Sequence, residues 1–385
     1  MDESKKEVFT SEKVKCIDLI AGARPNFMKI APIIDALKAA QSAGKPIKYR
    51  LIHTGQHYDR AMSGGFFEQL GIPDPDINLE VGSGTQAEQT ATIMMRYEKI
   101  LMENKSDVCV VVGDVNSTMA CAIVARKLGV PVAHIEGGIR SGDWSMPEEI
   151  NRVVTDSITN WFFTTSATAN ENLRRSGVAE DRIFFVGNTM IDTLLKHMPL
   201  LRPPQFWNEL GLQSRKYFVV TLHRPANVDS AKQLLCLLRA IANGTQGLPV
   251  VFPVHPRTAK SLREIDDKIP SLHYVDPQDY LEFNYLVMNA RGVITDSGGI
   301  TEETTVMGVP CLTLRDNTER PETVTIGTNE LIGTDPVNLT PALVRLMEGH
   351  WKKGSIPEKW DGQAAFRIVA ELETLLLRRV CKTLT

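Results

Sequence analysis

The triplet Ser297-Gly298-Gly299 follows an apolar run and precedes a segment that we expect to be helical. Bare backbone N–H groups at the positive end of a helix form a site for an anion such as phosphate. Two glutamates, Glu302 and Glu303, stand within one turn of this triplet. An anion site alone leaves these two acids unexplained.

Other polar side chains follow apolar runs that we expect to be strands, either directly or in the loop after the run. In chain order they include Arg24, Lys29, Gln56, Asp114, Glu136, Glu148, His223, Arg224 and His255. Any one of them has a structural explanation: Asp114 precedes a predicted helix and could simply cap it. Together they bring carboxylates, cations and histidines to one edge of two sheets, where a cleft exposes charge. The joint pattern indicates a functional cleft.

Apolar runs alternate with helical patterns along the whole chain. The predicted strands are CIDLIAGA, YRLIHTG, DVCVVVGD, VPVAHIEGG, WFFTTS and RIFFVGN in the first half, and YFVVTLHR, LPVVFPVH, LHYVD, GVITDSGG and VPCLTLRD in the second. Near-continuous apolar strands are typical of parallel sheets covered on both faces. The sequence therefore predicts an α/β protein with two doubly wound domains, whose ligands bind beyond the C-terminal strand ends.

The predicted domains meet where this alternation pauses. Residues 195–216 contain three prolines and no clean period, which predicts the connection between domains. We expect an N-terminal domain over residues 1–198 and a C-terminal domain over residues 199–364, followed by one long helix over residues 365–385.

Composition narrows the classes of protein that remain. The 385 residues carry a formal net charge of −3, so neither nucleic acid nor an anionic membrane is an expected partner. The polar amino-terminal segment lacks a signal-peptide core and no apolar run could span a bilayer, which predicts a cytoplasmic protein. Six cysteines form no CxxC pair, and we expect no metal site. The GSGTQA segment at 82–87 is expected to be a loop rather than a dinucleotide site.

Ten segments resemble those of the non-hydrolysing UDP-N-acetylglucosamine 2-epimerases, which are relatives of the GT-B glycosyltransferases. They are GARPNFMKIAPI, HTGQHYD, GDVNST, HIEGGIRSGD, MPEEINR, VGNTMID, TLHRPANVD, FPVHPRT, TDSGGITEE and LRDNTERPE. The resemblance implies a GT-B fold: two Rossmann-like domains, an active site in the cleft between them, and a last helix that packs back on the N-terminal domain. It also implies a homodimer that interconverts UDP-GlcNAc and UDP-ManNAc without an added metal or NAD cofactor.

The resemblance also accounts for the acids near the anion site. It implies that the diphosphate of UDP rests near Ser297, Gly298 and Gly299, while Glu303 accepts hydrogen bonds from the ribose hydroxyls. A carboxylate that holds a vicinal diol is also used by dinucleotide-binding folds. No role carries over to Glu302, for which a solvated position near the helix dipole is expected.

Further binding residues are implied by matching motifs. Arg24 and Lys29 match the cations of the family's first loop. Gln278 and Phe283 match the nucleobase side of the pocket, with Phe283 lining the uracil. Arg320 matches an arginine close to the nucleotide.

The chemistry of C2 inversion constrains the catalytic groups. The C2 proton is not α to a carbonyl, so either NAD oxidises C3, or UDP leaves C1 as C2 loses its proton to give a glycal. We found no NAD fingerprint, whereas the second route needs only cations and carboxylates. Asp114, Glu136 and Glu148 match the GD, HIE and first PEE positions of the family, so the resemblance implies that they are the acid–base groups. His223 matches the family's histidine near the diphosphate and is expected to stabilise the leaving UDP. Which carboxylate acts in each direction stays open.

Several alternatives also stay open. The substrate could be another UDP-acetamido sugar, such as a UDP-2,3-diacetamido uronic acid. A hydrolysing epimerase, a GT-B glycosyltransferase and a non-catalytic UDP-sugar-binding protein fit less well, because the family's first-loop motif and all three carboxylates are present. Ala226 replaces a glutamate of the family's HRxEN motif, which leaves that residue's function in doubt.

Many bacterial members of the family bind UDP-GlcNAc in a second site. The matching residues here are Gln56, Arg224 and His255. However, Asp59 stands where those members often have a glutamine, and the segment over residues 81–86 has no arginine. An arginine that grips phosphate with two donors is hard to replace. We therefore predict that the second site is weak or absent, unless Arg60 or Arg96 replaces the missing cation.

Overall fold

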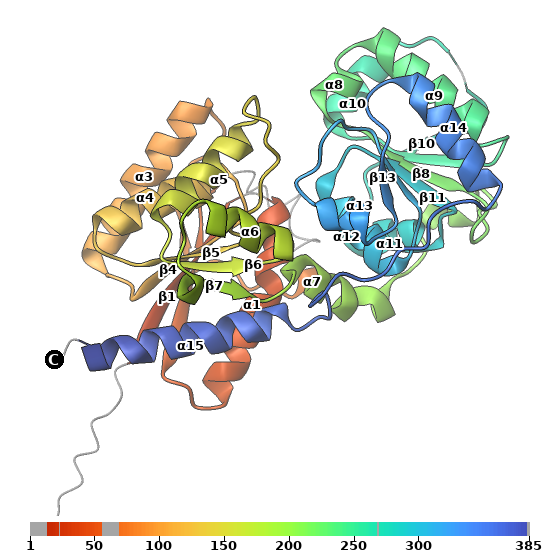
Figure 1. Cartoon of the computed structure of the whole chain (residues 1–385). Coiled ribbons are helices and arrows are strands. Elements are labelled where there is room, and N and C mark those ends of the chain that lie inside the picture. The colour runs from red at the N-terminus through yellow and green to blue at the C-terminus, as the bar shows by residue number, and fades with distance from the viewer. Residues whose placement is uncertain (1–13, 23, 56–68, 268, 383–385) are drawn as a thin grey trace, which may run out of the picture.

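Two parallel sheets lie in separate lobes of the protein (Figure 1). The computed structural model describes residues 14–22, 24–55, 69–267 and 269–382. Within this part of the chain, one sheet has seven strands in the order β3-β2-β1-β4-β5-β6-β7, and the other has six in the order β10-β9-β8-β11-β12-β13. In each sheet the strand order changes direction at the first strand of the chain, between β1 and β4 in one sheet and between β8 and β11 in the other. Doubly wound sheets bind ligands at such a position.

The strands follow the apolar runs closely. Their bounds are β1 (Lys15–Ala21), β2 (Ile47–His53), β3 (Ile77–Asn78), β4 (Val108–Val112), β5 (Val132–Ile135), β6 (Trp161–Thr164), β7 (Ile183–Phe185), β8 (Phe218–Thr221), β9 (Val250–Pro253), β10 (Leu272–Val275), β11 (Gly292–Thr295), β12 (Cys311–Thr313) and β13 (Asn329–Leu331). Every predicted strand is present. The additional strands β3 and β13 lacked a sequence signal, because β3 has two residues and β13 reads Asn-Glu-Leu.

Helices cover both faces of each sheet. Their bounds are α1 (Arg24–Ser42), α3 (Gln86–Glu103), α4 (Asn116–Lys127), α5 (Pro147–Ile158), α6 (Ala167–Arg175), α7 (Thr189–His197), α8 (Pro225–Val228), α9 (Ala231–Gly244), α10 (Pro256–Leu262), α11 (Tyr280–Asn289), α12 (Gly298–Met307), α13 (Pro321–Thr325), α14 (Pro336–Met347) and α15 (Ala364–Lys382), with 3-10 turns at Glu180–Arg182, Met198–Leu200 and Gln205–Trp207. Thr85 and Glu88 form a capping box at the start of α3. The end of the GSGTQA segment therefore has a structural role as a helix cap.

The last helix returns to the first sheet. In Figure 1, α15 runs beside α1, and Ile368 and Leu372 of α15 are buried in the same apolar cluster as Ile30 and Ile34 of α1. Burial of these side chains ties the end of the chain to its beginning. The domain boundary after residue 198 stays a prediction.

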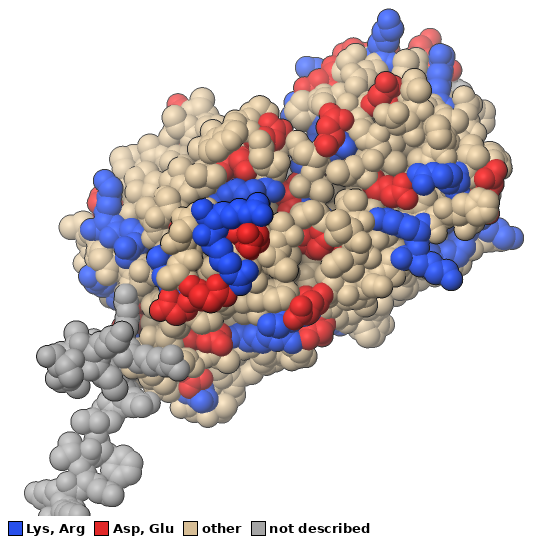
Figure 2. Space-filling view, in the orientation of Figure 1, with Lys and Arg blue, Asp and Glu red and all other residues tan. Residues whose placement is uncertain are grey.

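Charges are mixed on the molecular surface. On the face shown in Figure 2, lysine and arginine side chains alternate with aspartate and glutamate. Among the described residues, no helix is both long and apolar enough to cross a membrane.

Candidate active site

The register of β4 and β5 brings two predicted carboxylates to the same edge of the first sheet. Val112 of β4 is the register partner of Ile135 of β5, and each is the last residue of its strand. Glu136 follows Ile135 directly, and Asp114 follows Val112 after one glycine. The carboxyl ends of parallel strands meet at one edge, so these two side chains come from neighbouring positions.

Glu136 is buried among cations. Its side chain is 4% exposed, and its Oε2 accepts from Nζ of Lys29 at 2.7 Å and from Nη2 of Arg320 at 3.0 Å. Burial raises the pKa of Glu136, but Lys29 and Arg320 outweigh burial and hold that pKa below its ordinary value. Its φ of 69° lies in the left-handed region, which is strained for a residue with a Cβ and common at functional sites. The other oxygen, Oε1, is buried without a hydrogen-bond partner among the described residues.

Arg320 reaches Glu136 from the second lobe. Its Nη1 also donates to Oγ1 of Thr165 at 2.8 Å, and its Nε pairs with Oε1 of Glu302. The expectation of a solvated Glu302 is therefore wrong, because Glu302 is only 1% exposed. The first turn of α12 faces the interior between the lobes, and sequence alone did not reveal that Arg320 returns there as a partner. Burial, partly offset by Arg320, raises the pKa of Glu302 to about 7.

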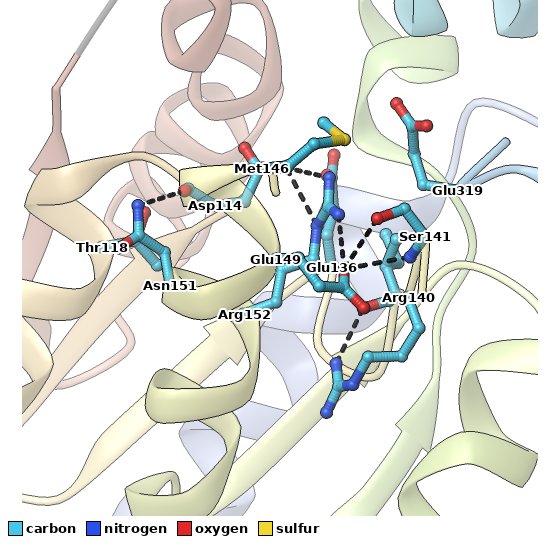
Figure 3. Close-up of polar contacts among 12 residues, drawn as sticks. Asp114, Thr118, Glu136, Arg140, Ser141, Met146, Glu149, Asn151, Arg152 and Glu319 are labelled. Carbon is cyan, nitrogen blue, oxygen red and sulfur yellow. Dashed lines mark hydrogen bonds and ion pairs between the residues drawn. The ribbon is translucent and has the colours of Figure 1, made fainter. Parts of the chain in front are cut away.

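Asp114 pairs with an arginine that the sequence analysis missed. Nη2 of Arg152 lies 2.5 Å from Oδ2 of Asp114, and Nη1 of Arg152 lies 2.8 Å from Oε2 of Glu149 (Figure 3). Glu149 also accepts from the backbone N–H groups of Ser141 and Gly142, each at 3.0 Å. Asp114 does not cap α4, whose N-cap position has no side-chain hydrogen bond. The arginine instead holds Asp114 in place.

Glu148, the third predicted carboxylate, is more exposed than the neighbouring Glu149. It is half-buried in the first turn of α5, and within the described part of the chain it forms no hydrogen bond or ion pair. The MPEEINR segment contained the signal for the Arg152 pair, because residues three and four apart share a helix face. That spacing could not decide between Glu148 and Glu149.

Strand register also positions His223. Thr221 of β8 is the register partner of Thr295 of β11, so His223 and Asp296 follow from adjacent strands. Nδ1 of His223 lies 2.9 Å from Oδ1 of Asp296, while Oδ2 of Asp296 accepts from the backbone N–H of Arg224 at 2.9 Å. Burial raises the pKa of Asp296, but the His223 contact and the other hydrogen bonds bring it below its ordinary value. An ionised Asp296 therefore orients the imidazole of His223.

The predicted anion site has the expected backbone form. Ser297 is the N-cap of α12 and makes no side-chain cap, so its turn leaves backbone donors to a ligand. A Cβ on Gly298 would lie 2.5 Å from Oε1 of Glu319, whereas one on Gly299 would meet only a methionine side chain at 3.2 Å. Glu319 pairs with Nη2 of Arg315 at 2.6 Å, and although burial opposes ionisation, Arg315 lowers the pKa of Glu319 to about 2.

The residues that we predicted to bind the nucleoside lie in α11, in α12 and in the segment before α11. Nδ2 of Asn284 donates to Oε1 of Glu303 at 3.4 Å, and burial raises the pKa of Glu303 to about 7 despite this contact. Phe283 is half-buried one residue before Asn284. Nε2 of Gln278 donates to the carbonyl of Asp276 at 2.7 Å, which fixes the loop before α11.

Comparison with known proteins identifies the family. A family model described as UDP-N-acetylglucosamine 2-epimerase matches residues 39–373. The chain belongs to this family. A curated UDP-N-acetylglucosamine 2-epimerase of Methanocaldococcus jannaschii is 42% identical over 349 residues, which cover 87% of this chain and 94% of that one. UDP-2,3-diacetamido-2,3-dideoxy-D-glucuronate 2-epimerase of Pseudomonas aeruginosa is 39% identical, over 82% of this chain and 87% of its own.

Solved structures of UDP-N-acetylglucosamine 2-epimerases share the fold. The M. jannaschii enzyme in complex with UDP-GlcNAc and UDP superposes with a TM-score of 0.81 at 40% identity, covering 93% of this chain and 99% of that one. The resemblance stated from ten motifs is thus confirmed, and so is the GT-B architecture.

Two residues that we predicted to bind ligand in this epimerase family member are not fully described by the structure. Gln56 lies outside the described residues, and Arg24 is described only as the first residue of α1, without its side chain. The other two residues matched to a second site are close to His223: its ring centroid lies 5.5 Å from that of His255, and Nε of Arg224 donates to the carbonyl of Asp296 at 2.9 Å. The prediction of a weak second site stays untested.

Proposed function

We propose that this protein interconverts UDP-GlcNAc and UDP-ManNAc by inverting C2 of the sugar. The observation that supports this function best is the contact of Glu136, which follows β5, with Lys29 of α1 and with Arg320, which precedes α13 in the second lobe. A carboxylate flanked by cations suits a reaction that moves a proton while negative charge builds up on a departing diphosphate. Family membership supports the same reaction class.

In the proposed mechanism, one carboxylate removes the C2 proton while the bond from C1 to the diphosphate oxygen breaks. The products of this step are a glycal and UDP, and the proton stays on the enzyme. UDP then adds back to C1 while a second carboxylate delivers a proton to the opposite face of C2. Asp114, Glu136 and Glu148 are the proposed acid–base groups, because all three lie at carboxyl ends of strands or in the first turn of a helix beside them.

Binding of the UDP moiety is proposed to use the second lobe. The turn over Ser297–Gly299 offers backbone donors to the diphosphate, with His223 held beside it by Asp296. Arg315 is a further candidate for this contact, since its Nη1 is buried without a hydrogen-bond partner among the described residues. Glu303 is proposed to accept from the ribose hydroxyls.

A UDP-2,3-diacetamido uronic acid is the alternative substrate. The P. aeruginosa relative that acts on UDP-2,3-diacetamido-2,3-dideoxy-D-glucuronate is nearly as similar to this chain as the M. jannaschii enzyme is. Both sugars carry an acetamido group at the inverted carbon, so the same acid–base groups would serve either one.

Incubation of the purified protein with each UDP-sugar in D₂O, followed by proton NMR, tests the proposal. We expect UDP-GlcNAc to give UDP-ManNAc with deuterium at C2, because the carboxylates exchange protons with solvent. Turnover of the diacetamido uronic acid alone would reassign the substrate. Retention of the C2 hydrogen through turnover would overturn the elimination mechanism while leaving the epimerase activity in place.

A further inference from the structure

Glu302 is a buried acid that the proposed mechanism does not use. It lies in the first turn of α12, next to Glu303, and its side chain is 2% exposed. Its Oε1 pairs with Nε of Arg320, whereas its Oε2 is buried without a hydrogen-bond partner among the residues described. Burying a carboxylate with one oxygen unpaired is costly, so a compensating role is expected.

Arg320 connects Glu302 to Glu136. One guanidinium group donates through Nε to Glu302 and through Nη2 to Glu136, at 3.0 Å in the second case. Whatever charge Glu302 carries therefore changes how strongly Arg320 stabilises the ionised form of Glu136. A negative Glu302 offsets the arginine, and a neutral Glu302 leaves the full positive charge facing Glu136.

The charges around this arginine do not balance. Four carboxylates, Glu136, Glu302, Glu319 and Glu322, act on Arg320. Glu319 is paired with Arg315, which leaves the other three to the two cations Lys29 and Arg320. In a site that excludes water an unpaired negative charge is expensive, so the cluster favours holding one proton. Burial raises the pKa of both Glu302 and Glu322, whereas the pKa of Glu136 is lowered by its two cations. The extra proton therefore resides on the acids of the second lobe.

We propose that Glu302 is a positioning residue that acts through Arg320: when ionised, it offsets this arginine and keeps Glu136 basic enough to take a proton from the sugar. The proposal rests on the proposed function, in which Glu136 is an acid–base group. The proposed role needs no contact between Glu302 and the sugar. The consequence is a rise in kcat/KM with pH that depends on Glu302, a residue outside the proposed acid–base set.

The sign of this dependence follows from the pKa of Glu302, which is raised to about 7. Below that pH, Glu302 is neutral, Arg320 is unopposed, and Glu136 is a weaker base. As the pH rises through about 7, Glu302 ionises and kcat/KM rises with it. A Glu302→Gln variant mimics the neutral form at every pH. We expect the variant to match the wild type near pH 6 and to fall roughly tenfold short at pH 8, for a change of one pKa unit in Glu136.

Two further variants separate this role from a merely structural one. Glu302→Asp keeps the charge and should restore part of the rise in kcat/KM. Glu322→Gln removes the same charge from the same cluster at a residue that forms no ion pair with Arg320 in the described structure. This matched control should reduce the rise less than Glu302→Gln does. Equal loss in all three variants at every pH would show that Glu302 only supports the fold.

A direct measurement distinguishes this inference from the proposed function. The ¹³C carboxyl signals of glutamate-labelled protein can be titrated by NMR, with Glu136 and Glu302 assigned by their absence in the Glu136→Gln and Glu302→Gln variants. We expect the Glu136 carboxyl to titrate at lower pH in Glu302→Gln than in the wild type. An unchanged Glu136 titration would overturn the inference. A shifted titration in a protein that epimerises no UDP-sugar would retain the inference and reject the proposed function.

Discussion

Nη2 of Arg152 lies 2.5 Å from Oδ2 of Asp114, and Nη1 of the same arginine lies 2.8 Å from Glu149. One helical arginine thus fixes a proposed catalytic carboxylate at the end of β4 and balances the charge of a buried glutamate on its own helix. Removal of the arginine would affect both, because each acid would lose its partner.

The Arg152→Met variant should lose about 3–5 kcal/mol of unfolding free energy, since it leaves the buried Glu149 without its cationic partner. Urea unfolding followed by circular dichroism measures this loss. A double variant with Glu149→Gln should recover part of it, because the buried charge that lost its cation is then gone. Strictly additive losses would contradict the coupling between Arg152 and Glu149.

Substitution of the three proposed acid–base groups should lower kcat, whereas substitution of the nucleotide-binding groups should lower UDP affinity. Asp114→Asn, Glu136→Gln and Glu148→Gln are each expected to lower kcat by about 10²–10⁴-fold while UDP still binds. Steady-state rates and calorimetry with UDP check this division. Glu98→Gln, an exposed change on α3, provides a matched control with no expected effect. Loss of UDP binding in the three variants would contradict the assignment.

Glu303 should control UDP affinity instead. Glu303→Ala removes the proposed acceptor for the ribose hydroxyls, with an expected cost of about 1–3 kcal/mol in UDP binding. Because only the ionised carboxylate is a full acceptor, UDP affinity of the wild type should rise as the pH passes through about 7. Calorimetry at pH 6 and pH 8 tests this, and a pH-independent difference between wild type and variant would argue against it.

The same buried acid should make stability depend on pH. The pKa of Glu303 is raised by burial from 4.5 to about 7 in the folded protein, so the folded state retains a proton that the unfolded state has lost. The contribution is fully present below pH 4.5 and is lost as the pH rises through about 7. Glu303→Gln should therefore lose less stability than the wild type between pH 5 and pH 8. Thermal melts across this range, without UDP, measure the difference.

Kinetics should reveal whether a second nucleotide-sugar site operates. With Asp59 in the TGQHYD segment and no arginine over residues 81–86, we expect initial rates to be hyperbolic in substrate. The reverse reaction from UDP-ManNAc should start without UDP-GlcNAc. A lag that a trace of UDP-GlcNAc abolishes would show that the second site is functional.

Local pattern in the sequence predicted the α/β fold class, most of the strands and the polar residues that follow them. Near-continuous apolar runs determined where β4, β8 and β11 lie, and the residues directly after such runs included Asp114 and His223. These inferences succeed because strand formation and the position of strand ends depend on neighbouring residues. Short polar β13 was missed because its strand conformation comes from pairing with β12 and not from its own residues.

Only the tertiary structure decided how the charges are paired. The sequence placed Glu302 beside an anion site and suggested a solvated side chain, yet Arg320 returns from the loop before α13 and meets it in the interior, together with Glu136 of the other lobe. Likewise, helical spacing made Arg152 a neighbour of both Glu148 and Glu149, and the packing of α5 against the end of β4 selected Glu149 and Asp114. Partner choice among charges depends on burial and on contacts between distant segments, because desolvation makes each unpaired group costly, and neither quantity is present in a local pattern.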